Sequence, residues 1–408
     1  MDIFPRSHRE LIRLLYLIIG GLGAILCTHT ILAYSLVDSD FVQDYAAAHA
    51  LLHGKSIYGE AISTFARELF PRATIIENFH PPFNALFFLP FSLFPYSVAF
   101  VVFNLIALSL FLMILEISLN YFGTSDKLKA VIRPLSLLWS PLYFALGTGN
   151  SSIYIAAFIV AGWVAQRKGN EVASGLAIGI ATCIKFFPGL FALYFLLTRK
   201  WTALITMSMT FIVVYALSFL TIGPNDFGIY FHEMLSRDVL EWGDFILNSS
   251  LTGLLAPLLT ETARTTPLIQ NSSLKLILIP LAQVVVLLAT AMAIKKLANT
   301  NTTNDAAFWI ICPAMILMSP ISWAHIFVVL IPAMLLITQH ALQNGDRGQI
   351  GLLMLSLIAV SIPDYYLANL LVSWYSPEHV PWYIFLSVKL PTFGVILLWL
   401  QLIRINQR

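Results

Sequence analysis

The sequence predicts an all-α polytopic membrane protein with about twelve membrane helices. Three observations support this fold class: 58% of the 408 residues are hydrophobic, 11% are charged, and the apolar residues form long stretches separated by short polar breaks. A soluble domain is about 25% charged and about 45–50% apolar, and its interior is too small to bury this much apolar surface. The composition therefore argues against a soluble enzyme, a nucleic-acid-binding protein and a secreted disulfide-rich protein.

The apolar stretches follow one another along the chain, and each is a complete or a short membrane helix. They are Leu11–Leu36, Ser97–Leu119, Val131–Gly147, Ser151–Gln166, Ala173–Lys185, Phe186–Thr198, Trp201–Thr221, Leu274–Ile294, Ala306–Pro320, Trp323–His340, Gln349–Pro363 and Trp382–Ile403. The first stretch is too long for a signal peptide and has no small-residue cleavage site, so we expect an uncleaved helix. We expect a single domain over residues 1–408, because no repeat or low-complexity segment divides the chain.

Three pairs of stretches are short and are joined by polar residues. The polar joints are Gly147–Asn150, Lys185–Pro188 and Ser319–His325. Arms of about 13–18 residues reach about 20–27 Å, whereas the hydrocarbon core is about 30 Å thick. Irregular backbone at such a depth is tolerated where it is buried in protein or lines a wet cavity. We therefore expect the three polar tips to line a cavity that opens to one side of the membrane.

The distribution of lysine and arginine predicts the side of the membrane to which the cavity opens. Lysine and arginine gather on the side that holds both termini, for example at 127–133. Positively charged short loops stay in the cytoplasm, so we expect both termini there and the cavity facing outward. The outer side then carries two long loops, at about 37–95 and 223–273. The amphipathic stretches Tyr45–Leu52 and Ile62–Leu69 in the first loop are expected to lie on the membrane surface.

The first long loop begins with a cluster of carboxylates, Asp38, Asp40 and Asp44. Three carboxylates at a membrane exit can be a solvated flank. They can equally supply a general base above a cavity in the membrane.

Lys185 lies at the tip of the second short hairpin, with apolar residues on both sides. A charge in that position is costly and indicates a functional site, unless the side chain extends to the membrane surface. An ammonium group suits a phosphate. His80 and His325 fall on the same expected side, as does Asn248. The sequence contains no phosphate-binding loop, dinucleotide motif, metal-ligand spacing or nucleic-acid-binding signature.

Taken in order, these features resemble glycosyltransferase family 87, which comprises GT-C-type membrane mannosyltransferases and their relatives. The matching elements are Asp40-Phe41 with Tyr45, Pro81-Pro82, the tip Gly147–Asn150, Lys185-Phe186-Phe187-Pro188, Asn248–Leu251 and the tip Ser319–His325. The resemblance extends over about residues 37–340. The chain departs from the family pattern at three places: the first tip lacks a glutamine, Asp44 replaces an aromatic residue, and His80 precedes the proline pair.

The resemblance implies a GT-C-like bundle and an inverting glycosyltransferase. Such an enzyme moves a sugar, usually mannose, from a polyprenyl-phosphate donor to a hydroxyl of a glycolipid or glycan acceptor on the outer side of the membrane. The expected partners are therefore the lipid-linked sugar donor, the acceptor and membrane lipids, without nucleic acid. The expected location is a bacterial inner (plasma) membrane. Because a monophosphate donor lacks the diphosphate that Mg²⁺ usually bridges, we expect neither a metal nor another cofactor.

The resemblance also assigns residues to this reaction. Asp40 is the expected base, because it matches the first-loop acid of the family, and Asp44 is the second candidate. The donor phosphate needs cations and hydrogen-bond donors. The candidates for this role are Lys185, His325, His80 and Asn248.

Two other functions remain open from the sequence. A flippase or transporter of polyprenyl-linked sugars would place its polar site near the middle of the membrane, between two internal repeats, and no such repeat is evident. A non-catalytic subunit in envelope assembly would have no need of Asp40 and Lys185.

Overall fold

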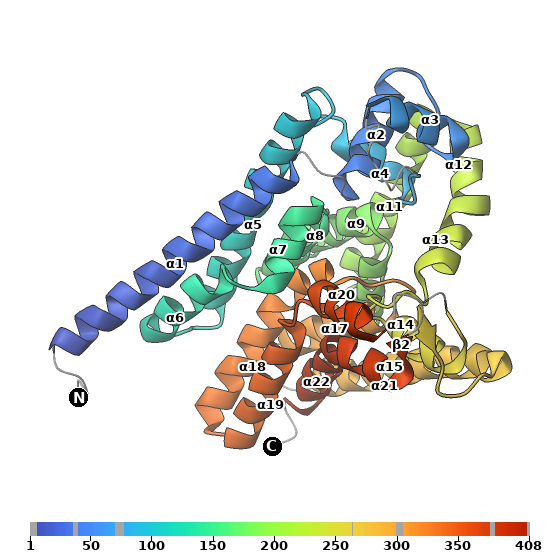
Figure 1. Ribbon diagram of the computed structural model, residues 1–408. Coiled ribbons are helices and arrows are strands. Elements are labelled where there is room, and N and C mark those ends of the chain that lie inside the picture. The colour runs from blue at the N-terminus through green and yellow to red at the C-terminus, as the bar shows by residue number, and fades with distance from the viewer. Residues whose placement is uncertain are drawn as a thin grey trace.

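The computed structural model describes residues 6–35, 40–69, 77–262, 264–298, 305–375 and 380–405, which are helical almost throughout (Figure 1). Within these residues, five helices are long and apolar enough to cross a membrane. They are α1 (Arg6–Tyr34), α5 (Tyr96–Tyr121), α11 (Trp201–Ile222), α15 (Ser272–Ala298) and the continuous pair of η3 (Ala324–Leu330) and α18 (Ile331–Asn344).

Other apolar segments are bent or short. Three bent pairs are α6 (Asp126–Ser136) with α7 (Ser140–Thr148), α19 (Arg347–Val360) with α20 (Asp364–Tyr375), and α21 (Trp382–Val388) with α22 (Leu390–Arg404), with bends of 44°, 64° and 58°. The short segments are α8 (Ser152–Arg167), α9 (Glu171–Ile184), η1 (Phe187–Leu190) with α10 (Phe191–Leu197), and α16 (Asp305–Trp309) with α17 (Ile311–Met318). All these segments except α20, which begins just after the expected stretch Gln349–Pro363, overlap the twelve expected stretches, and this confirms the all-α polytopic class.

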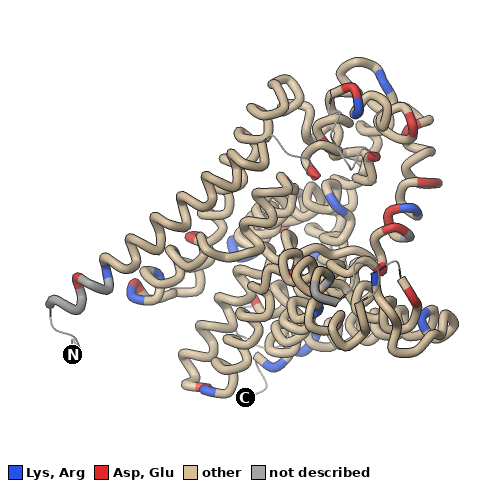
Figure 2. Tube along the Cα trace, viewed as in Figure 1, with Lys and Arg blue, Asp and Glu red and all other residues tan. Residues whose placement is uncertain are grey.

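The two sides of the bundle differ in charge. α1 runs parallel to α6 and α7, since Gly20 of α1 faces Pro134 and Tyr34 at its other end faces Gly147. Their N-terminal ends therefore lie on one side, where Arg133 pairs with Glu116 at 2.6 Å. Figure 2 shows basic residues at these ends of α1 and α6, and acidic residues around the long loops at the opposite side.

The short helix α9 lies directly against α11, because two glycines leave no side chain between them. A Cβ atom on Gly175 would lie 2.3 Å from a backbone oxygen of α11, and one on Gly179 would lie 2.7 Å from a threonine side chain. Small residues permit this close helix packing in membranes. At the end of α9, Lys185 has an extended backbone, and Pro188 then lies at the start of η1. Because Gly175 and Gly179 hold α9 against α11, they also position Lys185, the residue that follows α9.

The two long loops are also mainly helical. The first holds α2 (Asp40–Leu52), α3 (Gly59–Leu69) and α4 (Pro82–Phe88). The second holds α12 (Pro224–Ile229), η2 (Tyr230–Met234), α13 (Leu235–Trp242), α14 (Leu251–Leu259) and β1 (Thr265–Thr266), which pairs in parallel with β2 (Val380–Pro381). The segments α12, η2 and α13 follow one another without a break along one edge of the molecule (Figure 1).

The expected position of Tyr45–Leu52 on the membrane surface is wrong. α2 is buried along most of its length, because its alanines pack against α3 and the residues around it. Ile62 and Phe65 of α3 face the same cluster, so the apolar face of α3 also packs on protein. This packing anchors α2 and thereby positions Asp40 and Asp44.

Candidate active site

Asp40 is the first residue of α2, and the tip of the first short hairpin holds its carboxylate. Nδ2 of Asn150 donates to Oδ2 of Asp40 at 3.1 Å, while 26% of the Asp40 side chain remains exposed. The tip turns at Gly149, where φ is +63° and where a Cβ atom would lie 2.8 Å from Phe41. Both the left-handed backbone and the close approach of α2 require a glycine. This turn places Asn150 beside Asp40.

A chain of hydrogen bonds connects Asn150 to His325 at the third tip. Oδ1 of Asn150 accepts from the backbone N–H of Ser152 at 3.0 Å and from its hydroxyl at 2.6 Å. Because the second bond uses the hydroxyl proton, Oγ of Ser152 accepts the Nδ1–H of His325 at 2.8 Å. Nε2 of His325 therefore keeps a lone pair. The sequence analysis did not identify Ser152, whose proximity to Asn150 in the chain was the available signal.

Two hydrogen-bond acceptors, Nε2 of His325 and Oδ2 of Asp40, lie close together between the first and third tips. Nε2 of His325 lies 3.9 Å from Oδ2 of Asp40, and it has no hydrogen-bond partner among the described residues. A buried acceptor without a partner is costly, which indicates a place for a hydroxyl group or water from outside the chain. A substrate hydroxyl that approaches the pair would find two groups able to take its proton.

Asp44 lies one turn further along α2 and holds His80. Its side chain is 1% exposed, and its Oδ1 accepts from Nδ1 of His80 at 2.8 Å and from Nδ2 of Asn84 at 3.3 Å. A carboxylate on one imidazole nitrogen fixes the tautomer and the orientation of the ring. The structure thus places Asp44 behind His80, and the imidazole is the group that reaches the cavity described next.

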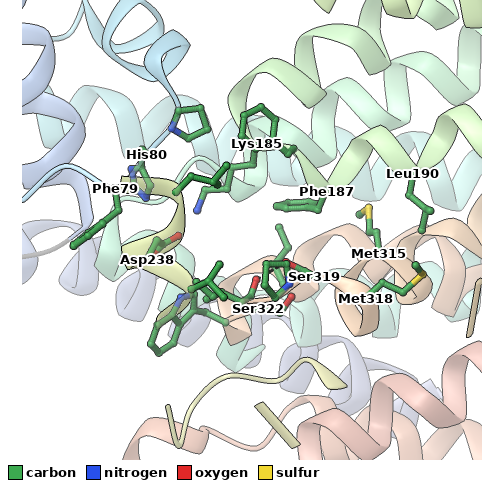
Figure 3. Close-up of a pocket in the computed structure, with 18 of the residues that line it drawn as sticks. Phe79, His80, Lys185, Phe187, Leu190, Asp238, Met315, Met318, Ser319 and Ser322 are labelled. Atoms are coloured by element: carbon green, nitrogen blue, oxygen red, sulfur yellow. Dashed lines mark hydrogen bonds between the residues drawn. The ribbon is translucent and has the colours of Figure 1, made fainter. Parts of the chain in front are cut away.

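A cavity of about 330 Å³ lies between the two long loops and the tips of the second and third hairpins. Lys185 and His80 line it from one side, Asp238 of α13 lies opposite, and His325 also belongs to its lining. Figure 3 shows Lys185, His80 and Asp238 pointing toward one another from three different elements. The remaining wall is largely apolar, with phenylalanine and methionine side chains. The cavity can hold an anionic group next to an apolar chain.

The ammonium group of Lys185 makes no hydrogen bond or ion pair with any residue in the described ranges, although its backbone N–H donates to the oxygen of Ala181 at 3.2 Å. Lys185 sits in the break between α9 and η1, where its own backbone is extended. An unpaired ammonium in a largely apolar cavity needs an anion. The structure therefore brings together three of the four expected phosphate-binding residues, Lys185, His80 and His325.

The fourth expected phosphate-binding residue, Asn248, lies elsewhere. It is fully buried, and its side chain makes four hydrogen bonds to backbone groups. Nδ2 donates to the oxygens of Gly243 and Pro320 at 2.7 and 2.8 Å, and Oδ1 accepts from the N–H groups of Ser250 and Ser322 at 3.1 and 2.9 Å. These bonds attach the second long loop to the third tip and leave Asn248 no hydrogen-bonding capacity for a phosphate.

Asp238 is a cavity residue that the sequence analysis did not identify. It shares one face of α13 with Leu235 and Val239, which also line the cavity. Burial raises the pKa of the Asp238 carboxyl to about 6, although the nearby His80 and Lys185 act in the opposite direction. The sequence feature that could have identified Asp238 is the presence of an acidic residue on the apolar face of an amphipathic helix.

A second cavity, of about 560 Å³, lies on the other side of Asp40. Asp40 lines this second cavity and is not part of the lining of the first. Its walls come mainly from α1, α7 and α20 and include five aromatic side chains, those of Tyr34, Tyr143, Phe144, Tyr365 and Tyr366. The expectation that all three hairpin tips line one cavity is therefore wrong, because the first tip lines this second cavity and not the first. Two cavities lie on either side of the Asp40–His325 pair.

The site contains an accessible carboxylate and a neighbouring cavity whose lysine ammonium and imidazoles suit an anionic group. Within the described residues, no three histidine, cysteine or acidic side chains lie close enough together to bind a metal ion. Asp38 of the first-loop cluster lies outside the described residues. In a helical membrane protein, this arrangement is that of a transferase in which a hydroxyl attacks and a phosphorylated group leaves.

The chain belongs to glycosyltransferase family 87, whose model matches residues 78–320. This range includes His80, Asn150, Lys185 and Asp238 and ends just before His325. Membership confirms the resemblance and the predicted glycosyltransferase activity, and it argues against a transporter or a non-catalytic subunit.

The proteins that resemble the chain include two mannosyltransferases and one solved structure. A polyprenol-phosphate-mannose-dependent α-(1-2)-phosphatidylinositol mannoside mannosyltransferase from Mycobacterium tuberculosis is 25% identical over 360 residues, which cover 84% of this chain and 78% of the relative. The corresponding pentamannoside mannosyltransferase from Mycolicibacterium smegmatis is 26% identical over 272 residues, or 66% of this chain and 62% of the relative. The crystal structure of ArnT from Cupriavidus metallidurans bound to undecaprenyl phosphate has a TM-score of 0.42 and 15% identity, over 94% of this chain and 76% of that chain.

Proposed function

We propose that the protein transfers mannose, with inversion, from a polyprenyl-phosphate donor to a hydroxyl of a lipid-linked or glycan acceptor substrate. The names of the two mannosyltransferases support both the donor and a glycolipid acceptor substrate. The observation that carries the proposal is the position of the Asp40–His325 pair between a cationic cavity and an aromatic one.

In the proposed reaction, the hydroxyl of the acceptor substrate lies against Oδ2 of Asp40. The carboxylate takes the hydroxyl proton while the oxygen attacks the anomeric carbon of the donor sugar. The bond from that carbon to the phosphate oxygen breaks on the opposite face, and polyprenyl phosphate leaves with the electron pair. Asn150 orients the carboxylate, and His325 offers a second polar group at the point of attack.

The donor phosphate occupies the cavity that contains Lys185 and His80. A phosphate leaving group needs no general acid, because fixed positive charge and hydrogen-bond donors stabilise the developing negative charge. Lys185 supplies the charge. Asp44 orients His80 so that its Nε2 faces the phosphate. The apolar part of the wall accommodates the first isoprene units.

The acceptor substrate approaches through the second cavity, because Asp40 lines that cavity. Aromatic rings stack well on the apolar faces of sugars, and tyrosine hydroxyls can bond to sugar hydroxyls. Tyr365 and Tyr366 are 49% and 65% exposed, so they can meet a glycolipid headgroup at the edge of the bundle.

We also propose that the reaction requires no metal ion, because a monophosphate donor can be neutralised by the protein's own cations. Transfer should therefore continue in EDTA, and its loss on chelation, with recovery on adding Mg²⁺ or Mn²⁺, would contradict this part of the proposal.

The proposed site faces outward from a bacterial inner membrane, with both termini in the cytoplasm. The charge difference between the two sides supports this orientation. All three native cysteines are buried, so introduced cysteines can report the topology. A membrane-impermeant maleimide added to intact cells or spheroplasts should label a Glu60→Cys variant and leave Lys127→Cys unlabelled until the cells are opened. The reverse pattern would overturn the orientation.

The reaction itself can be tested with purified protein, radiolabelled polyprenyl-phosphate mannose and total host lipid, with the Asp40→Asn variant in parallel. We expect label in a new glycolipid with the wild type, and a rate about 10²–10⁴ lower with the variant, because the base is lost. Donor binding should be nearly unchanged. A variant with wild-type turnover would exclude Asp40 as the base, and a wild type that neither binds nor uses this donor would contradict the proposed sugar.

A further inference from the structure

One polar group of the cationic cavity has no part in the reaction described so far. Asp238 lies on the face of α13 that lines the cavity, whereas the other face carries Arg237, which pairs with Glu77 at 2.8 Å and with Glu241 at 3.2 Å. α13 thus turns the Asp238 carboxylate toward the cavity and the adjacent Arg237 away from it.

Asp238 is half-buried, and its carboxylate makes no hydrogen bond or ion pair with any residue in the described ranges. Lys185 is likewise unpaired there, although both side chains line the same cavity (Figure 3). Because no ion pair within 4.0 Å joins them, a space separates the two charges. A carboxylate that is partly removed from water needs hydrogen-bond donors, and this space is where a bound molecule would supply them.

The two charges suit different parts of one ligand. The phosphate of the donor is attracted to Lys185 and His80 and repelled by Asp238. The sugar carries hydroxyl groups, which are hydrogen-bond donors, and two adjacent hydroxyls can bind the two oxygens of one carboxylate. An ionised carboxylate is purely an acceptor, so it complements the sugar and not the phosphate. A ligand with phosphate at one end and sugar at the other fits this distribution.

We propose that Asp238 binds hydroxyl groups of the donor sugar and contributes to the choice of that sugar, with α13 covering the sugar in the cavity. This inference rests on the proposed function and adds to it a residue that recognises the transferred group. It also gives Asp238 a second effect: once the sugar has left, the carboxylate faces the bare phosphate of the product and weakens its binding.

An alternative is that Asp238 serves as the counter-charge of Lys185 in the empty cavity. The two roles predict opposite results for the donor. If Asp238 binds the sugar, its removal weakens binding of polyprenyl-phosphate mannose but leaves binding of polyprenyl phosphate unchanged or tighter. If Asp238 is only a counter-charge, its removal strengthens the binding of both lipids.

The test uses the full-length protein in detergent or nanodiscs with Asp238→Ala and Asp238→Asn. Glu233→Gln is the matched control, because Glu233 is an exposed carboxylate five residues earlier on the same continuous helical segment. Dissociation constants are measured for polyprenyl-phosphate mannose and for polyprenyl phosphate. Values of kcat/KM are compared for the mannose donor and its glucose counterpart, which differs in configuration at C2.

For Asp238→Ala, we expect at least a tenfold weaker binding of the mannose donor, unchanged or tighter binding of polyprenyl phosphate, and a smaller preference for mannose over glucose. The control should match the wild type in all three measurements. Tighter binding of both lipids, or weaker binding of both together with a lower Tm, would overturn the inference. The inference would also be overturned if Asp238→Ala transferred mannose normally with unchanged binding of both lipids and an unchanged preference for mannose over glucose. A wild type that does not bind the mannose donor would overturn the proposed function and, with it, this inference.

Discussion

Nδ1 of His80 lies 2.8 Å from Oδ1 of the buried Asp44, so a carboxylate that looked like a possible base is occupied by an imidazole. Oδ2 of Asp44 has no hydrogen-bond partner among the described residues, and the side chain does not line either cavity. We therefore propose that Asp44 acts through His80, whereas Asp40 is open to a substrate. This difference makes the roles of the two carboxylates separable by experiment.

The first prediction concerns this pair. Asp44→Asn should reduce kcat/KM by roughly tenfold, because the amide holds the imidazole less firmly. In a His80→Gln background, the same substitution should have little further effect, because the group that Asp44 orients is already absent. The measurement is a double-mutant cycle on kcat/KM. Equal losses in both backgrounds would instead make Asp44 an independent participant in the reaction.

Lys185 is the subject of the second prediction. Lys185→Met should raise the dissociation constant of the donor by about 10- to 100-fold, since a hydrogen bond to a charged group contributes about 1.5–3 kcal/mol. Lys185→Arg should recover part of the loss, because the charge is kept but the guanidinium is larger and planar. Direct binding of the donor checks both values. Wild-type binding and turnover in Lys185→Met would show that the side chain only extends to the membrane surface.

Asn248 provides the third prediction. Asn248→Ala removes four hydrogen bonds to buried backbone groups, each of which costs about 1–3 kcal/mol when left unsatisfied. The variant should therefore have a clearly lower Tm, while the KM for donor in the remaining folded protein stays close to that of the wild type. The control is Asn271→Ala, because Asn271 is an exposed asparagine that caps α15 in the same loop. A large rise in KM with an unchanged Tm would restore Asn248 to the phosphate site.

The sequence could predict much of the fold because apolar stretches and charge bias are local signals. The three short hairpins were recognisable from their length, and their polar tips do lie near one another. The role of Asn248 in attaching the second long loop to the third tip was not predictable from the sequence. Its partner Pro320 is 72 residues away in the chain and accepts through a backbone oxygen, which leaves no signal in a side-chain motif. The same holds for the two cavities, which depend on how α1 and α20 pack around Asp40. Asp238 was overlooked because its importance comes from the face of α13 that lines the cavity.

The final prediction is a pH dependence of stability that depends on Asp238. Burial raises the pKa of this carboxyl to about 6 from its ordinary 3.8, so the folded protein binds the proton more tightly than the unfolded chain. The resulting stabilisation is complete below about pH 4 and is lost as the pH rises through 6. Asp238→Asn cannot ionise and should escape this loss. The Tm difference between the variant and the wild type should therefore shift in favour of the variant between pH 4.5 and 7.5.

The charged neighbours of Asp238 are His80, Lys185, Glu241 and Asp40. Both proteins contain these neighbours, so their own titration largely cancels in the Tm difference. A Tm difference that stays constant over this range would show that Asp238 keeps an ordinary pKa in the folded protein.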